Sequence, residues 1–366
     1  MSAATPYLPV FEPRLPADPR RYGIGIVGTG WIVQDAHLPA YEKAGFRIEA
    51  VYDLDPAKAR EVAEVRGIPH VCESLDELLA RDDVDIVDIA VPAKEQPELA
   101  LAAIAAGKDL LCQKPFAETY GEALGIVEAA EAAGRTVAVN QNMRYGSAWK
   151  VLRGLVDSGW IGAPRSAEIQ VAVTTHWHEY GEWLVPLERL EIMYHSIHYF
   201  DALRVLLGDP ATVYCRGLRH PEQQVVGETW TTALLEYPDD RLGLVRIDHN
   251  DIDDERDWSS TFRLDGLGGV AKGSTWYLFE GAIEKGEQLT FRCPEVTGEA
   301  WIEPHLRSTG MPDSFIGTMG ELQAALEAGE QPSHSGRDNL KTMQLVFAAY
   351  RSMEEHRPVA LDEIDA

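Results

Sequence analysis

Short apolar runs alternate with longer segments of helical periodicity over the first part of the chain. The runs predict strands at 22–27, 48–52, 70–71, 84–90, 109–112 and 136–139. The segments between them predict a helix that ends near Gly45 and further helices at 56–66, 75–81, 95–106 and 118–133. Because strands that alternate with helices form a parallel sheet, this region predicts an α/β domain with a doubly wound parallel sheet.

After Asn140 the pattern changes. Helices are predicted at 146–158, 190–207, 313–328 and 336–355, and strands at 166–173, 211–217, 228–236, 242–248, 260–265 and 275–280. A run of strands after one helix predicts a C-terminal α+β domain with a large open, mostly antiparallel sheet. The expected organisation is an extended N-terminal arm at 1–20, the first domain at 21–140 and the second at 141–366.

Composition narrows the class of protein. The 366 residues are 45% hydrophobic, but no apolar run reaches the ~18 residues of a membrane span, so no membrane partner is expected. The net charge of −26 argues against a nucleic-acid partner, because no overall positive field is present to neutralise phosphates. The four cysteines are scattered without a C-x-x-C pair, which indicates reduced thiols and a cytoplasmic protein.

A glycine-rich loop follows the first predicted strand. Gly28-Thr29-Gly30-Trp31-Ile32-Val33 has the form G-x-G-x-x-V, in which the two glycines permit a tight turn and the close approach of a pyrophosphate. Asp53 ends the next predicted strand, where a carboxylate binds the ribose diol of NAD and repels the extra phosphate of NADP. This context predicts a Rossmann domain that binds NAD. The alternative role of Asp53 is a cap for the helix that begins at Pro56.

Lys114 stands at the end of the predicted strand 109–112 and is followed by Pro115, which cannot continue a strand ladder. Open α/β sheets bind ligands at the carboxyl ends of their strands, so Lys114 is a candidate catalytic residue. The alternative is a surface lysine in a loop. The neighbouring loop at Val91-Pro92 is expected to lie over the cofactor beside Lys114. The full set of expected cofactor contacts is Gly28, Gly30, Trp31, Ile32, Asp53, Val91, Pro92, Gln113 and Lys114.

The predicted helix 190–207 carries a second chemical cluster. Glu191 and His195 are four residues apart, as are Tyr194 and His198, so each pair shares a helix face. Histidines beside a tyrosine and an acid can act as a general base and hold a substrate. The alternative is a partly buried helix whose imidazoles serve packing.

Taken together, these residues resemble the Gfo/Idh/MocA (glucose–fructose oxidoreductase / inositol dehydrogenase) family over nearly all of 21–356. The resemblance is carried, in order, by Gly28 and Gly30, Asp53, Val91-Pro92, Gly107-Lys108, Gln113-Lys114-Pro115, Asn142-Met143-Arg144-Tyr145 and His198-Tyr199-Phe200-Asp201. It implies a Rossmann domain joined to an open sheet that forms an oligomer interface, and hence a homo-oligomer, a dimer or tetramer. It also implies oxidation or reduction of a sugar or polyol carbon with NAD(P), with Lys114 and His198 in contact with the reacting hydroxyl.

The chain departs from the family pattern in three places. Gln113 replaces the usual glutamate before the lysine, which removes an ion-pair partner and favours the neutral form of Lys114. Tyr194 replaces the usual aspartate four residues before His198. No glycine-rich run precedes that helix, and the region contains Trp177, Trp183 and Pro186, with His176 and His178 on either side of Trp177.

The leading hypothesis is hydride transfer to NAD from a secondary alcohol of a sugar or sugar derivative. His198 is expected to accept the hydroxyl proton, Lys114 to share a hydrogen bond with that oxygen, and Tyr194 to orient the sugar. His195 completes the catalytic candidates. The expected substrate contacts are Asn142, Arg144, Trp177, His178, Tyr194 and His195, and no metal is expected.

Three other functions stay open. An NAD-dependent glycosidase of the same fold would oxidise the sugar transiently at C3, eliminate the C1 substituent and return the hydride, with Tyr194 or His195 as an extra base. A sulfonated sugar glycoside would then need Arg144, Lys150, Arg189 or a histidine for its anionic group. A metal site made of His176, His178, Glu191, His195 and His198 is a further alternative, as is a non-catalytic redox sensor.

Overall fold

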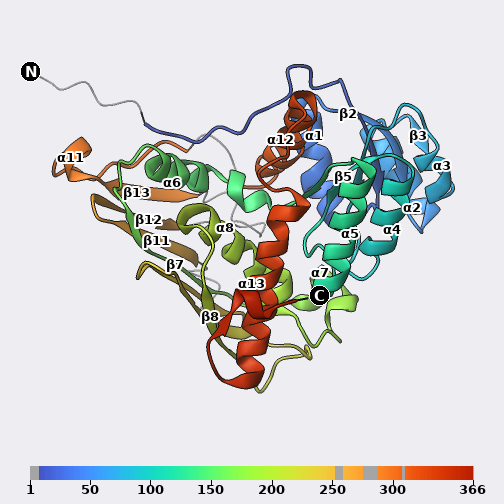
Figure 1. Ribbon diagram of the computed structural model, residues 1–366. Helices are drawn as coiled ribbons and strands as arrows, with labels where there is room; N and C mark the ends of the chain where they lie inside the picture. The colour runs from blue at the N-terminus through green and yellow to red at the C-terminus, as the bar shows by residue number, and fades with distance from the viewer. Residues whose placement is uncertain (1–7, 252–258, 275–286, 307–309, 366) are drawn as a thin grey trace, which may run out of the picture. The chain divides into compact units, whose positions relative to one another are not determined.

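The computed structural model describes residues 8–251, 259–274, 287–306 and 310–365 (Figure 1). These residues form two compact units. The Rossmann unit comprises Pro13–Tyr145 and Met311–Leu340, and the sheet unit comprises the described residues of Met1–Glu12, Gly146–Gly310 and Lys341–Ile364. None of the described helices has the length and hydropathy that crossing a membrane requires.

The Rossmann unit is built on a six-stranded parallel sheet. Its strands are β1 (Gly23–Val27), β2 (Arg47–Tyr52), β3 (His70–Val71), β4 (Ile86–Ile89), β5 (Asp109–Cys112) and β6 (Val137–Val139). The order β3-β2-β1-β4-β5-β6 reverses between β1 and β4, and doubly wound sheets bind their ligands at the carboxyl ends of strands beside such a reversal. The predicted parallel α/β fold is confirmed, and each strand lies within two residues of its predicted bounds.

Helices connect these strands and pack along the sheet (Figure 1). They are α1 (Leu38–Ala44), α2 (Pro56–Arg66), α3 (Leu75–Leu79), α4 (Gln96–Ala105) and α5 (Tyr120–Ala133), with a π-helical turn at Val33–His37 before α1 and a 3-10 turn at Asn142–Tyr145. The local sequence determines where they begin. Asp55 caps α2, and Thr119 forms a capping box with Glu122 at the start of α5.

A helix from the end of the chain also belongs to the Rossmann unit, which differs from the predicted division at residue 140. Helix α12 (Ser314–Ala328) places Phe315 and Met319 in the same buried cluster as strand β1. Gly317 of this helix lies directly against Tyr145, because a Cβ at 317 would be only 2.3 Å from the tyrosine ring. The apolar face of α12 is therefore buried by long-range packing that the order of elements along the chain does not reveal.

The sheet unit contains an eight-stranded sheet of order β13-β12-β11-β7-β10-β9-β8-β14. The strands are β7 (Pro164–Ala172), β8 (Thr212–Leu218), β9 (Trp230–Glu236), β10 (Leu242–Asp248), β11 (Ser259–Gly266), β12 (Gly269–Ser274), β13 (Gln288–Arg292) and β14 (Val359–Ala360). All pairs except β7–β10 are antiparallel, which confirms the predicted mostly antiparallel sheet. The sequence pattern misses β12, β13 and β14, and the strand predicted at 275–280 lies outside the described residues.

One face of this sheet is buried against helices and the other carries partly exposed side chains. Along β7, Ile169 and Val171 are buried, whereas Glu168 and Gln170 are not. Helix α8 (Ile197–Leu207) packs against β7 and β10 (Figure 1). The other described helices of this part of the chain are α6 (Ser147–Asp157), α7 (Trp177–Tyr180), α11 (Pro294–Thr297) and α13 (Gly336–Glu355), with 3-10 turns at Glu182–Leu184 and Leu361–Glu363.

The predicted helix 190–207 is not one continuous α-helix. A π-helical turn at Ile192–Ser196 precedes α8. Because a π-helix closes its hydrogen bonds over five residues instead of four, side chains around the turn are rotated relative to an unbroken α-helix. The face on which each polar residue lies therefore has to be taken from the structure.

The described part of the predicted arm, residues 8–20, has no regular secondary structure. Within the sheet unit, the backbone N–H of Phe11 donates to Lys150 O at 2.9 Å, and the guanidinium of Arg153 lies 3.6 Å from the centre of the Phe11 ring. All four cysteines of the chain are buried and free.

Candidate functional site

The carboxyl ends of β1, β4 and β5 carry three predicted site positions in the Rossmann unit. Gly28 directly follows β1, Val91 lies two residues beyond β4, and Lys114 lies two residues beyond β5. The pairing between β4 and β5 continues into the loop that follows β5, because Gln113 N donates to Ile89 O at 2.9 Å. These positions therefore lie at the edge of the sheet where a dinucleotide binds in this topology.

The glycine loop has the shape that a pyrophosphate requires. Gly28 has a φ of +95°, and a Cβ at this position would be 2.5 Å from Ala90 O, so only glycine fits. A Cβ at Gly30 would meet nothing within 4 Å, which leaves space for a phosphate to approach the backbone. Trp31 is 41% exposed and Ile32 is partly buried against the core.

Asp53 is tied to the glycine loop and does not cap α2. Its Oδ2 accepts hydrogen bonds from Thr29 N and Thr29 Oγ1, both at 2.7 Å, and its Oδ1 accepts from Asp55 N at 2.8 Å. The helix cap is Asp55, whose side chain accepts from Ala57 N at 3.0 Å, so the capping alternative for Asp53 is wrong. A carboxylate offers about four lone-pair positions, and the three bonds leave room for one ribose hydroxyl.

Lys114 is partly buried, and burial lowers the pKa of its ammonium group from 10.5 to about 8. Its backbone N–H donates to the side-chain Oε1 of Gln113 at 2.7 Å. A lysine with a pKa near 8 exchanges its proton close to neutral pH, which suits a group that shares a proton with a hydroxyl.

Sequence reasoning missed the buried network beneath Lys114. His37 Nδ1 lies 2.7 Å from Asp88 Oδ2, and His37 Nε2 lies 3.1 Å from Gln113 Nε2 and 3.2 Å from Asn140 Nδ2. Because both amides can only donate to His37 Nε2, the imidazole must carry its proton on Nδ1 and donate it to Asp88. The amide of Gln113 thus donates to His37 and accepts from Lys114 N. A glutamate at this position could not make the first of these bonds.

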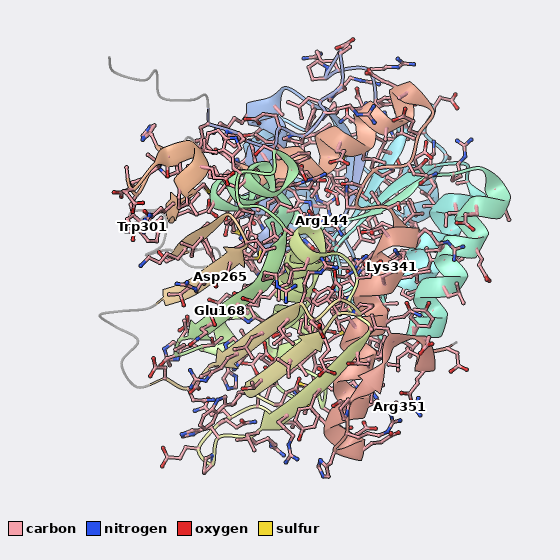
Figure 2. All side chains as sticks on the ribbon, turned by 60° about the vertical axis from the view of Figure 1, so that its left-hand side comes forward. Arg144, Glu168, Asp265, Trp301, Lys341 and Arg351 are labelled. Atoms are coloured by element: carbon pink, nitrogen blue, oxygen red, sulfur yellow. The ribbon has the colours of Figure 1, made fainter. Side chains whose placement is uncertain are left out.

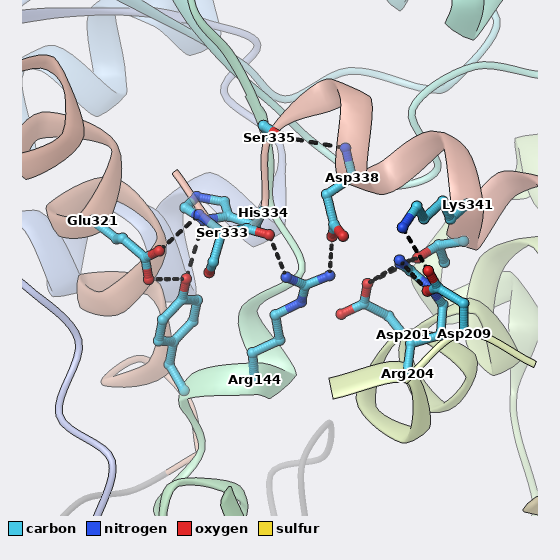
Figure 3. A network of polar contacts seen from close by, with 12 residues as sticks. Arg144, Asp201, Arg204, Asp209, Glu321, Ser333, His334, Ser335, Asp338 and Lys341 are labelled. Atoms are coloured by element: carbon cyan, nitrogen blue, oxygen red, sulfur yellow. Dashed lines mark hydrogen bonds and ion pairs between the residues drawn. The ribbon is translucent and has the colours of Figure 1, made fainter. Parts of the chain in front are cut away.

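Asn142 and Arg144, two of the predicted substrate contacts, are buried in the Rossmann unit. Arg144 Nη1 donates to Ser333 O at 2.8 Å, and Arg144 Nη2 pairs with Asp338 at 2.6 Å (Figure 3). Asn142 Nδ2 donates to Ser314 Oγ at 3.2 Å. These contacts connect the 3-10 turn after β6 to the segment that contains α12.

In the sheet unit, two residues of the predicted helix cluster meet as their spacing predicts. His195 Nδ1 lies 3.6 Å from Glu191 Oε1, and both residues are buried. His198 is also buried, at 3% exposure. Tyr194 is partly buried, and its ring lies edge-on to Trp183 with the centroids 5.4 Å apart.

His249 joins this cluster, although no spacing along the chain connects it to the helix. It directly follows β10, its ring centroid lies 4.6 Å from that of His195, and its Nε2 lies 4.0 Å from Glu191 Oε1. Burial lowers the pKa of His249 from 6.5 to about 3. The sequence feature that could have identified His249 is the polar triplet Asp248-His249-Asn250, which stands at the end of a predicted strand.

The candidate residues before the helix differ in how close they lie to this cluster. Trp177 packs partly against the buried group around Leu190, with its ring centroid 4.7 Å from that of His249. His178 is exposed, and its Nδ1 lies 3.1 Å from Glu182 Oε1. Among the described residues, the groups with metal-binding geometry include neither His176 nor His178.

The two other cations considered for an anionic substrate each face a carboxylate. Lys150 Nζ lies 2.6 Å from Glu12 Oε2, and Arg189 Nη2 lies 3.9 Å from Glu354 Oε1. Arg189 also lies over the ring of Tyr350.

Two models of one protein family match the chain. A model described as "Oxidoreductase family, NAD-binding Rossmann fold" matches residues 22–141, and a model described as "GFO/IDH/MocA C-terminal domain" matches residues 149–271. Together they cover most of both units. The first model identifies the domain that contains the glycine loop and Asp53 as NAD-binding.

Individual proteins agree with these matches. A D-apiose dehydrogenase of Paraburkholderia graminis is 28% identical over 349 residues, which are 95% of this chain and 92% of that protein. An inositol 2-dehydrogenase of Gluconacetobacter diazotrophicus is 40% identical over 144 residues, 38% of this chain and 42% of that protein. The crystal structure of an oxidoreductase from Agrobacterium radiobacter, in complex with NAD+, L-tartaric acid and magnesium, superposes with a TM-score of 0.83 at 25% identity, over 93% of this chain and 99% of that one.

The Asp53 contacts predict how the cofactor site responds to substitution. Asp53→Ala removes two hydrogen bonds to Thr29 and the predicted acceptor for the ribose, so we expect the Kd for NAD, measured by titration calorimetry, to rise at least roughly tenfold. Asp55→Ala is the matched control. It removes the cap of α2, which lowers the free energy of unfolding by about 1 kcal/mol, and it leaves the contacts between Asp53 and Thr29 in place. Equal NAD affinity in wild type and Asp53→Ala, or equal losses in both variants, would contradict this assignment.

Proposed function

Because the chain belongs to the Gfo/Idh/MocA family of oxidoreductases and contains its NAD-binding domain, we propose that it oxidises a secondary hydroxyl of a sugar or sugar derivative. The observation that carries the proposal is Lys114 at the end of β5, with a pKa of about 8, on the same sheet edge as the glycine loop. The named relatives, which are dehydrogenases of D-apiose and of inositol, support a polyhydroxylated substrate.

The residues of the chain divide the chemistry between them. NAD, when bound, supplies the hydride acceptor for the carbinol hydrogen. We assign His198 as the base that takes the hydroxyl proton, Lys114 as the donor of a hydrogen bond to the same oxygen, and Tyr194 as a group that orients the sugar. The products are the ketone, NADH and one proton, which returns from the histidine to solvent.

The predicted substrate contacts do not all receive equal support. Tyr194 and Trp177 are partly buried and His178 is exposed, so their side chains retain surface for a ligand. Asn142 and Arg144 are bound to Ser314, Ser333 and Asp338, which supports a role in holding the loop after β6 in place.

A substrate panel tests the proposed reaction. With NAD and D-apiose, inositol and common monosaccharides, we expect NADH to accumulate in proportion to substrate for at least one compound. Lys114→Met and His198→Asn should each lower kcat about 10²–10⁴-fold, and His198→Asn should leave the Kd for NAD unchanged. Lys58→Met, an exposed lysine on α2, is the control that should keep the wild-type rate. Wild-type kcat in either catalytic variant would refute the assignment of that residue.

The same panel separates the dehydrogenase from the glycosidase of this fold. A glycosidase returns its hydride, so it would release an aglycone without accumulating NADH. An anionic glycoside has little support, since Arg144, Lys150 and Arg189 each pair with a carboxylate. Aglycone release with NAD needed only in catalytic amount would replace the dehydrogenase assignment.

The pKa of Lys114 predicts the pH dependence of oxidation. If the ammonium form donates to the reacting oxygen, kcat/KM falls as pH rises through about 8, because the neutral amine predominates above the pKa. Gln113→Glu places a carboxylate beside Lys114, raises its pKa and should move this fall to higher pH. Lys114→Arg should remove the fall, since a guanidinium stays charged. A rate that instead rises through pH 8 would make Lys114 the base.

We further propose that the partly exposed face of the larger sheet binds a second copy of the chain. Leu244 pairs with Leu234 on one side and with Glu168 on the other, and Glu168 pairs with Arg263. Figure 2 shows Glu168 and Asp265 on neighbouring strands β7 and β11 of this sheet. Apolar residues beside charges of both signs suit a self-complementary interface. A cytoplasmic location also stays a prediction, supported by the four free cysteines.

Light scattering tests this interface. We expect the mass of a dimer or tetramer for the wild type and a lower mass for Leu244→Arg, which places a charge in the middle of the face. Val65→Arg, at a position of α2 that is 72% exposed, is the control and should leave the mass unchanged. A single-chain mass for the wild type would refute the proposal.

A further inference from the structure

We propose that Glu191, His195 and His249 bind one divalent transition-metal ion, and that zinc is the ion whose ligand preferences they fit best. Each residue offers one ligand atom, and the three atoms all lie within 4.8 Å of one another. Two imidazoles and one carboxylate form a donor set that zinc uses in sites with three protein ligands. The whole cluster lies inside the sheet unit.

The backbone holds the three residues from two separate elements. His195 lies in the π-helical turn, and Glu191 is the residue directly before that turn. His249 directly follows β10. His249 N donates to Thr229 O at 3.0 Å, and Thr175 N donates to His249 O at 3.1 Å, so the position of His249 is set by the sheet. The exposures of Glu191, His195 and His249 are 0%, 6% and 1%.

The distances suit a shared ion better than direct bonds between the side chains. His195 Nδ1 is 3.6 Å and His249 Nε2 is 4.0 Å from the same oxygen, Glu191 Oε1. Both distances exceed a normal hydrogen bond. Ligand bonds of about 2.1 Å in a tetrahedral site place neighbouring ligand atoms about 3.4 Å apart, so small movements would close the cluster around zinc.

A second layer of hydroxyl groups orients each ligand. Thr175 Oγ1 lies 2.7 Å from His249 Nδ1, and Tyr199 OH lies 3.2 Å from His195 Nε2, so in each ring the other nitrogen faces Glu191. Ser196 Oγ and Thr231 Oγ1 both donate to the Glu191 carboxylate at 2.5 Å. Hydrogen bonds of this kind to the ligands are a regular feature of metal sites, because they fix ring orientation and tautomer.

The hydrogen bonding of His249 also favours a cation at this position. In the described part of the chain, His249 Nε2 has no hydrogen-bond partner, although it is buried. A buried nitrogen without a partner costs about 1–3 kcal/mol, and a metal ion would satisfy it together with the carboxylate.

The proposed ligands differ from those that the sequence suggests. His176, His178 and His198 lie outside the cluster, and His249 takes their place beside Glu191 and His195. With three protein ligands, zinc keeps a coordination position for water or a ligand hydroxyl. The site is therefore open in its coordination, in contrast to a closed structural site with four protein ligands.

Metal uptake by the full-length protein tests the proposal directly. After treatment with a chelator and its removal, we expect titration with Zn²⁺ to reach about one equivalent per chain, and Co²⁺ to give the visible absorption bands of a tetrahedral site. Failure of the wild-type protein to retain either ion at micromolar concentration would refute the site. This result does not depend on any variant folding correctly, or on the identity of the sugar substrate.

Substitutions in and around the cluster test whether the bound ion is held by Glu191, His195 and His249. His249→Ala should abolish stoichiometric uptake, and Thr175→Val, which removes only the hydroxyl beside His249 Nδ1, should weaken zinc affinity roughly 10–100-fold. The control is His70→Ala, in the partly exposed group Glu49, His70 and Asp83, and it should bind zinc like the wild type. Circular dichroism checks that each variant is folded. Uptake that persists in folded His249→Ala, or that is lost in His70→Ala, would overturn the assignment.

Discussion

The hydrogen bond between His37 and Asp88 is the interaction on which the candidate catalytic position depends. Asp88 lies in β4 and also accepts from Tyr41 OH at 2.7 Å, so its Oδ2 is held from two sides. It fixes the proton of His37 on Nδ1, which makes Nε2 an acceptor for the amide of Gln113. Gln113 in turn accepts from the backbone of Lys114. The backbone of Lys114 is thus held by a buried chain of hydrogen bonds that begins at Asp88 and passes through His37 and Gln113.

A comparable arrangement orders the cluster in the sheet unit. The buried carboxylate of Glu191 is held by hydroxyl groups from the helix and from β9, and it faces two imidazoles from different elements. Both units also place a π-helical turn next to their candidate site, at Val33–His37 and at Ile192–Ser196. Such turns are frequent at functional sites because they rotate side chains out of the regular α-helical pattern.

Features that depend on local sequence could be predicted. The glycine loop, strand β5 with Lys114 after it, and α13 follow from residues that are neighbours along the chain. The sequence left two alternative roles for Asp53, and the helix cap was excluded by the contacts of Asp53 with Thr29 and by the cap that Asp55 makes. The family resemblance inferred from the motifs is confirmed by matches over both units.

Features that depend on contacts between distant segments could not be predicted. The return of α12 to the Rossmann unit, the network of His37 with Gln113, and the approach of His249 to Glu191 all join residues far apart in the sequence. Strand β12 was missed because glycine and polar residues interrupt its apolar alternation. Strand β13 was missed although Leu289 and Phe291 alternate with polar residues, because its five residues give only a short pattern. The sequence pattern therefore located the strand ends at which candidate site residues lie. It did not identify the residues from distant segments that contact them.

The most direct test of the account is to follow the hydrogen of the reacting carbon. With a sugar that is a substrate and carries deuterium at its secondary carbinol carbon, the account predicts that each accumulated NADH contains one deuterium at C4 of the nicotinamide, as measured by mass spectrometry and NMR. Deuterium that is lost to water, or NADH that forms without the label, would contradict hydride transfer from that carbon.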